Sequence, residues 1–137
     1  MTPDPQPKKE PPSASHPLIG VVGPCAAGKT TLIAGLSQLG YHTRHIAQEH
    51  SYVPDMWQRL TKPDLLIFLD ASYLVTCHRR KLDWTEAEFA EEQRRLSHAR
   101  QHADLVLDTD GMSREEVLRH VVSFLQQRLP SFTPLNS

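Results

Sequence analysis

The spacing of apolar residues along the chain predicts strands that alternate with helices. The apolar runs at 18–23 and 65–70 lack polar alternation, which is typical of strands buried on both faces. A helix is expected at 28–39, where leucine and isoleucine recur at helical spacing before Gly40. A weaker strand pattern at 41–47 interleaves histidine and arginine with apolar residues and fits an edge strand.

The second half of the chain continues this alternation. Thr85-x-x-Glu88 and Ser113-x-x-Glu116 match capping boxes and so predict the starts of two helices. The segment 103–108 is expected to be a strand, and 73–82 a helix. We therefore predict an α/β domain with a small, mainly parallel sheet and right-handed crossovers.

Parallel sheets of this kind bind ligands at the carboxyl ends of their strands. Four polar or glycine-rich segments follow the predicted strands, at 23–30, 48–51, 70 and 108–111. We expect these segments to lie along one edge of the sheet and to form the site.

The length of 137 residues is that of one compact domain. We expect one folded domain at 17–130, preceded by a tail at 1–16 and followed by a disordered C-terminus at 131–137. The tail contains five prolines and almost no large apolar residue, so it is predicted to be disordered. A proline-rich docking peptide is the alternative for the tail.

The charge and the cysteines restrict the classes of partner. The formal net charge of -1 gives no reason to expect nucleic acid or a membrane surface as the main partner. No apolar run approaches the roughly 20 residues that cross a bilayer. Cys25 and Cys77 form no C-x-x-C pair, and we expect both to be reduced thiols in a cytoplasmic protein.

The most specific motif is a G-x-x-x-x-G-K-[ST] sequence between the first predicted strand and helix. Its backbone N–H groups would converge on phosphate oxygens at the positive end of the helix dipole. Lys29 would neutralise the β- and γ-phosphates of ATP, and the Thr30 hydroxyl would bind Mg²⁺. The predicted nucleotide-binding residues are Gly23, Pro24, Cys25, Ala26, Ala27, Gly28, Lys29, Thr30 and Thr31.

With this loop, the chain resembles P-loop kinases of the nucleoside and nucleotide kinase group, with dephospho-coenzyme A kinase and the deoxynucleoside kinases as nearer relatives. The resemblance runs from Leu18 to about Leu129. Besides the loop, it is carried by the strand at 63–72, the basic segments 77–81 and 93–96 in place of a lid, and the final strand at 103–111. It implies a three-layer P-loop NTPase fold and transfer of the ATP γ-phosphoryl group to a small acceptor, such as a nucleoside or nucleotide.

In these kinases, lid arginines neutralise the charge that grows on the transferred phosphoryl group. The resemblance makes four arginines candidates for this role, with the first two favoured: Arg79, Arg80, Arg94 and Arg95. The alternative is that they form the solvated faces of two surface helices beside the glutamates of the same segments.

Two carboxylates compete for the role of metal ligand or base. Asp70 ends an apolar strand and has the local form of a Walker B aspartate, which would bind the metal. The resemblance, however, places this strand after the one that usually carries that residue, so the usual strand is missing. Glu49 follows the second strand and could then serve as base or metal partner. The alternatives are a structural role for Asp70 and a solvent-exposed Glu49.

The acceptor is left open by the sequence. Relatives insert a helical acceptor-binding region between 47 and 63, and about fifteen residues are too few to build it. The side chains that could hold a small acceptor there are Gln48, His50, Tyr52, Trp57 and Arg59, with a core position as the alternative for Trp57. A non-catalytic ATP sensor, a slow ATPase and a homodimer all remain open.

Two other patterns are set aside. Thr61-Lys62-Pro63-Asp64 and Asp108-Thr109-Asp110-Gly111 resemble GTPase motifs but occur in the wrong order. His98 and His102 lie one helical turn apart, as in some metal sites, and His42 and His45 are also close in sequence. Neither pair has a cysteine or carboxylate at a recognised ligand spacing, so exposed histidines are favoured.

Overall fold

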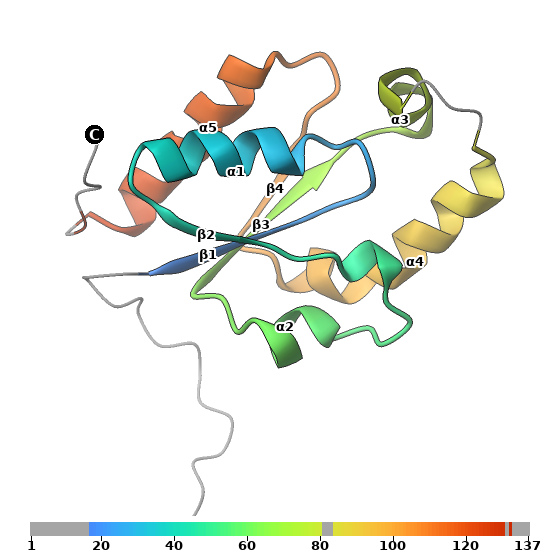
Figure 1. Ribbon diagram of the computed structural model, residues 1–137, viewed down its shortest axis with the longest axis horizontal. Helices are drawn as coiled ribbons and strands as arrows, with labels where there is room; N and C mark the ends of the chain where they lie inside the picture. The colour runs from blue at the N-terminus through green and yellow to red at the C-terminus, as the bar shows by residue number, and fades with distance from the viewer. Residues whose placement is uncertain (1–16, 81–83, 131, 133–137) are drawn as a thin grey trace, which may run out of the picture.

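The computed structural model describes residues 17–80, 84–130 and 132 (Figure 1). The predictions for the tail at 1–16 and the C-terminus at 131–137 therefore fall outside the described residues, except at Phe132.

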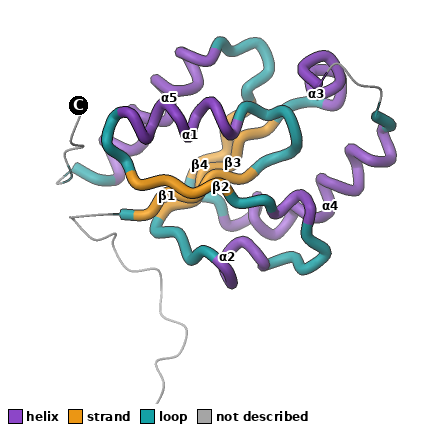
Figure 2. Tube along the Cα trace, in the orientation of Figure 1, coloured by secondary structure: helices purple, strands orange, loops and turns teal. Residues whose placement is uncertain are grey.

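The centre of the fold is a parallel sheet of four strands in the order β2-β1-β3-β4 (Figure 2). The strands are β1 (Leu18–Val22), β2 (His42–His45), β3 (Leu65–Asp70) and β4 (Leu105–Asp108). The sequence predictions of a central strand at 65–70 and an edge strand within 41–47 are confirmed.

Helices cover both faces of this sheet, so the predicted α/β architecture is confirmed. The helices are α1 (Lys29–Gln38), the short 3₁₀ helix η1 (Gln48–His50), α2 (Met56–Leu60), α3 (Tyr73–Arg80), α4 (Glu86–His102) and α5 (Arg114–Arg128). Figure 1 shows α1 and α5 on one face of the sheet and α2 and α4 on the other. Helix α3 follows β3 and lies beyond the carboxyl end of the sheet.

Both predicted capping boxes are present. The Thr85 hydroxyl accepts the N–H of Glu88 at 3.1 Å, and the Glu88 carboxylate accepts the N–H of Thr85 at 2.9 Å. Ser113 and Glu116 make the same reciprocal pair at the start of α5. The hydrogen bonds from Ser113 lower the pKa of the Glu116 carboxyl group, because they stabilise its charged form.

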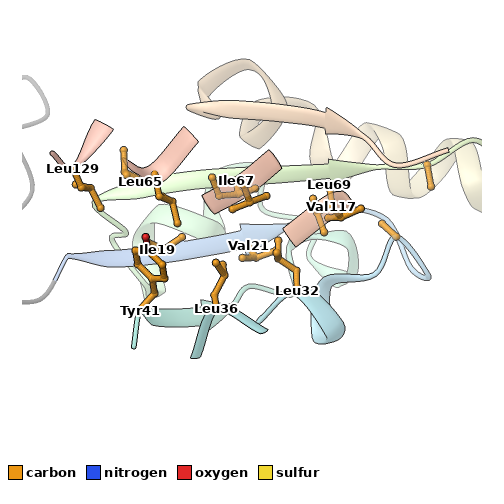
Figure 3. Close-up of a cluster of buried hydrophobic side chains, with 14 residues drawn as sticks. Ile19, Val21, Leu32, Leu36, Tyr41, Leu65, Ile67, Leu69, Val117 and Leu129 are labelled. Atoms are coloured by element: carbon orange, nitrogen blue, oxygen red, sulfur yellow. The ribbon is translucent and has the colours of Figure 1, made fainter. Parts of the chain in front are cut away.

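Side chains of β3 point alternately into two hydrophobic clusters, which explains why the strand sequence is continuously apolar. Leu65, Ile67 and Leu69 pack with α1 and α5 (Figure 3). Leu66 and Phe68 face the other side and pack against α2 and α4. The sheet thus has a core on each face.

The second cluster contains Trp57 of α2, together with Leu96 and Ala99 of α4. Trp57 is buried, and its indole N–H donates to Nδ1 of His98 at 3.0 Å. The core alternative for Trp57 is therefore confirmed. None of the described helices is both long and apolar enough to cross a membrane.

We expect Leu36→Ala to lower the free energy of unfolding by about 3 kcal/mol, because it removes a fully buried side chain between α1 and the sheet and leaves a cavity. Leu74→Ala is the matched control, since that helical leucine is 76% exposed and its loss should change stability by less than about 0.5 kcal/mol. Chemical denaturation measures both. Equal losses would contradict this packing.

Candidate functional site

The predicted phosphate-binding loop, residues 23–30 and called the phosphate loop below, lies at the carboxyl edge of the sheet, between the end of β1 and the start of α1 (Figure 1). Gly28 precedes α1 with φ 97°, and Ala26 also has a positive φ, of 67°. Among the described residues, no side-chain hydrogen bond caps the N-terminus of α1. Its N–H groups and the positive end of the helix dipole are therefore available to an anion.

Gly23 begins the loop in close contact with β3. A Cβ atom at this position would lie 2.0 Å from the carbonyl oxygen of Leu69. Only glycine allows the backbone to approach β3 so closely. The start of the loop is thus fixed by the central strand.

Lys29 is buried at the base of this loop, with 6% of its surface exposed. Its ammonium group donates to the carbonyl oxygens of Gly23 and Pro24, which fold the loop around it. It also forms an ion pair with Oε2 of Glu49 at 2.9 Å. A buried ammonium group needs such partners because it has lost its water.

Glu49 is supplied by η1, directly after the edge strand β2, and is 2% exposed. The alternative of a solvent-exposed Glu49 is therefore wrong. Its Oε1 atom has no hydrogen-bond partner among the described residues. One oxygen of this buried carboxylate thus binds Lys29 while the other retains its accepting capacity.

The charges around Lys29 also affect His45, the last residue of β2. Partial burial lowers the pKa of His45, and the nearby Lys29 ammonium lowers it further, while Glu49 acts in the opposite direction. On balance, these effects favour the neutral form of the imidazole.

Arg79 of α3 reaches back to the loop. Its guanidinium donates to the carbonyl oxygen of Ala26 at 3.1 Å and to the hydroxyl and carbonyl oxygens of Thr109 at 3.2 and 3.1 Å. It lines a cavity of about 410 Å³ together with Gly28, Thr31 and Thr109. Arg79 is thus brought to the loop as expected.

Arg80 is the last residue of α3, and its side chain lies outside the described part of the chain. The other lid candidates belong to α4. Arg94 is exposed and pairs with Glu91, which agrees with the surface alternative. Arg95 instead donates to the carbonyl oxygen of Glu49 at 3.1 Å and lies 4.2 Å from the ring centre of Tyr52.

Asp70 lies at the same sheet edge, but its carboxylate is occupied. It accepts the N–H of Ala71 at 3.0 Å and a guanidinium N–H of Arg100 at 2.7 Å. Arg100 in turn covers the ring of Phe68. Asp70 therefore ties β3 to α4, which favours the structural alternative over the metal-ligand role.

Two functional positions were not identified from the sequence. Glu92 of α4 is 7% exposed and accepts the N–H of Cys25 in the phosphate loop at 3.0 Å. Its signal was its helical spacing from Leu96 and Ala99, which places a carboxylate on the buried face of α4. Arg100 lacked a comparable signal, because its partner lies 30 residues away.

The predicted acceptor side chains do not converge. Gln48 is buried and binds the backbone of Val53, Arg95 and Trp57, so it fixes the local fold. Tyr52 is 80% exposed. Arg59 forms an exposed pair with Asp55. His50 lines a cavity together with Cys25 and residues of α4.

Among the described residues, one group has the composition of a metal site, namely Cys25, Glu49 and His50, whose ligand atoms lie within 4.8 Å of one another. The Lys29 ammonium on the same carboxylate opposes a second cation there. For Mg²⁺ at the loop, the exposed Thr30 hydroxyl offers an oxygen ligand of the kind that this ion prefers.

The histidine pair on α4 makes contacts with other protein groups. His98 and His102 stack at 4.2 Å, with Nδ1 of His98 accepting from Trp57 and Nδ1 of His102 bonded to the backbone of His98. The Nδ1 atoms of both histidines are thus engaged in hydrogen bonds within the protein.

No protein-family model matches this sequence, and no curated protein matches it either. Function is therefore inferred from the loop and from the residues around it.

We expect Lys29→Met to lower the free energy of unfolding by about 3 kcal/mol, because it leaves the Glu49 carboxylate buried without its counterion. The double variant Lys29→Met/Glu49→Gln should lose less than the sum of the two single variants. Arg59→Met is the control, because its exposed pair with Asp55 should contribute less than about 1 kcal/mol. Additive losses in denaturant titrations would show that the two groups do not interact.

Proposed function

We propose that this protein binds Mg²⁺-ATP at the loop 23–30 and transfers the γ-phosphoryl group to a small hydroxyl-bearing acceptor. The observation that carries the proposal is the buried Lys29–Glu49 pair at the start of an uncapped helix. This pair links Lys29, the lysine of a complete G-x-x-x-x-G-K-[ST] motif, to Glu49. The Oε1 atom of Glu49 has no hydrogen-bond partner among the described residues. The parallel sheet with helices on both faces is compatible with the P-loop NTPase fold, which we propose as well.

In this proposal, the N–H groups at the start of α1 hold the α- and β-phosphates, and Lys29 exchanges its carbonyl partners for the β- and γ-phosphates. Thr30 contributes its hydroxyl to Mg²⁺, which when bound neutralises charge on the β- and γ-phosphates. Arg79, held beside Ala26 and Thr109, adds a positive charge over the phosphates.

Glu49 would act as general base toward the acceptor. Its carboxylate takes the proton of the acceptor hydroxyl while the bond from that oxygen to the γ-phosphorus forms. The bond from the γ-phosphorus to the bridging oxygen breaks, and ADP leaves with those electrons. Most of the catalysis would come from positioning and charge neutralisation.

A non-catalytic ATP sensor or a slow ATPase is the second candidate. It is supported by the segment 47–63, where four of the five side chains proposed for acceptor binding point to the core, to solvent or to the local backbone, with His50 as the exception. In that case, Glu49 would serve only to hold Lys29 in the loop.

We expect Lys29→Ala to lower turnover and ATP affinity by at least about 100-fold each, because it removes the charge at the β- and γ-phosphates. Glu49→Gln should lower turnover by about 100-fold while changing ATP affinity little, because it removes the base and keeps the shape. Arg119→Ala, an exposed change on α5, is the control. Calorimetry gives the affinities, and transfer from γ-labelled ATP to a panel of hydroxyl compounds gives turnover.

The two candidates separate on the same protein. ATP binding without transfer to any acceptor would reject the kinase and leave the sensor. Unchanged ATP affinity in Lys29→Ala would reject the phosphate loop as the nucleotide site.

A further inference from the structure

Two cavities adjoin opposite ends of the phosphate loop. The first, of about 410 Å³, touches Ala27, Gly28 and Thr31, at the start of α1. The second, of about 530 Å³, touches Cys25 at the other end of the loop and is walled by α4. Both volumes lie in the range of small-molecule sites.

The position of Lys29 assigns the two cavities to the two ends of the nucleotide. In a loop of this type, the N–H groups at the helix start hold the α- and β-phosphates, and the lysine reaches the β- and γ-phosphates. The ammonium of Lys29 lies against Gly23 and Pro24 and pairs with Glu49. The Glu49 carboxylate in turn lies within 4.8 Å of ligand atoms of Cys25 and His50, which line the second cavity. The second cavity therefore adjoins the γ-phosphate end, where an acceptor must stand.

The wall of the second cavity is negatively charged. Of the described residues that line it, three carry carboxylates, namely Glu88, Glu91 and Glu92, and one carries a guanidinium, Arg95. Glu91 pairs with Arg95, at 3.3 Å, and also with Arg94, so the excess of negative charge comes from Glu88 and Glu92. The wall thus has an excess of carboxylates, which repels anions and concentrates cations.

Glu49 does not line the second cavity, but it lies beside two residues that do. Its carboxylate lies within 4.8 Å of ligand atoms of Cys25 and His50, and both of these residues line the second cavity. The side chain is 3% exposed, yet Oε1 has no hydrogen-bond partner among the described residues. A buried acceptor atom without a donor is costly, and the hydroxyl group of a bound molecule would satisfy it.

We infer that the second cavity binds the phosphoryl acceptor, and that this acceptor is a cationic or uncharged hydroxyl compound, such as an amino sugar, an amino alcohol or a nucleoside. Compounds that already carry a phosphate, nucleotides included, are disfavoured by the carboxylates of α4. This inference rests on the proposed kinase function and narrows its acceptor.

The same charges would assist product release. The acceptor gains a phosphate group on reaction and so changes from a neutral or cationic compound to one with added negative charge. Beside Glu88, Glu91 and Glu92, the product is bound less favourably than the acceptor was. The wall thus discriminates between substrate and product by charge.

The potential in the cavity can be measured without knowing the acceptor, because Cys25 lies in its wall. In a Cys77→Ser background, the rates of Cys25 modification by a trimethylammonium-ethyl and a sulfonato-ethyl methanethiosulfonate are compared, each normalised to a small free thiol. We expect the cationic reagent to be favoured by about tenfold.

A charge-neutral variant and its control identify the source of that preference. Glu88→Gln/Glu91→Gln should abolish most of the preference, since glutamine retains the capping geometry at 88 without the charge. Glu86→Gln removes the same charge from the same helix away from the cavity and should leave the ratio unchanged. Equal normalised rates in the parent protein, or an unchanged ratio in the double variant, would overturn the charge assignment.

Acceptor choice is then tested with matched pairs, glucosamine against glucosamine 6-phosphate and cytidine against cytidine monophosphate, each with Mg²⁺ and γ-labelled ATP. We expect transfer to the unphosphorylated member of a pair at a rate at least about tenfold higher. A preference for the phosphorylated members would overturn the inference while leaving the kinase intact. Failure of ATP to bind in calorimetry would instead reject the proposed function, and the thiol experiment would still report the charge of the cavity.

Discussion

The ion pair between Lys29 and Glu49 requires that several elements of the fold be correctly placed. A buried ammonium group and a buried carboxylate are each unfavourable alone, and they are tolerated because they lie 2.9 Å apart. Lys29 begins α1, while Glu49 follows the edge strand β2, so the pair forms only when β2 aligns in parallel with β1. The loop is then closed around the lysine by the carbonyl groups of Gly23 and Pro24. Local loop geometry and strand order are thus energetically linked.

The sequence predicted those elements that depend on residues close to one another in the chain. The run at 65–70 is apolar throughout because alternate residues face two cores, and this pattern needs no knowledge of the partners. The capping boxes at 85–88 and 113–116 are closed by residues three positions apart, and so they could be recognised directly. The edge position of β2 followed from its polar residues. The phosphate loop was identified by a motif whose glycines permit the backbone conformation and whose lysine supplies the positive charge.

The parts of the site that could not be predicted depend on side chains that are distant in sequence. Asp70 has the local form of a metal ligand, but Arg100 binds its carboxylate from 30 residues away. Glu92 reaches Cys25 across 67 residues. Neither pairing could be inferred from residue spacing, because each depends on how α4 crosses the sheet. The helical spacing of Glu92 indicates that it is buried, but not which residue it contacts. Composition also indicated an acceptor-binding cluster near Trp57, whereas the short helix α2 turns that ring into the core.

The two glycines of the phosphate loop are required for different reasons. A Cβ atom added at Gly28 would meet no other atom, so this position is constrained by its backbone angle alone. A Cβ atom added at Gly23 would clash with the carbonyl oxygen of Leu69. A side chain at 28 would strain the turn before α1, but one at 23 would push the loop away from the central strand. Substitution of Gly23 is therefore limited by the packing of the loop against β3. This limit would hold even in a related protein that no longer binds phosphate. Among related sequences, conservation of Gly23 would therefore indicate that the loop still packs against β3. Conservation of Gly28 would indicate that the turn before α1 keeps its conformation.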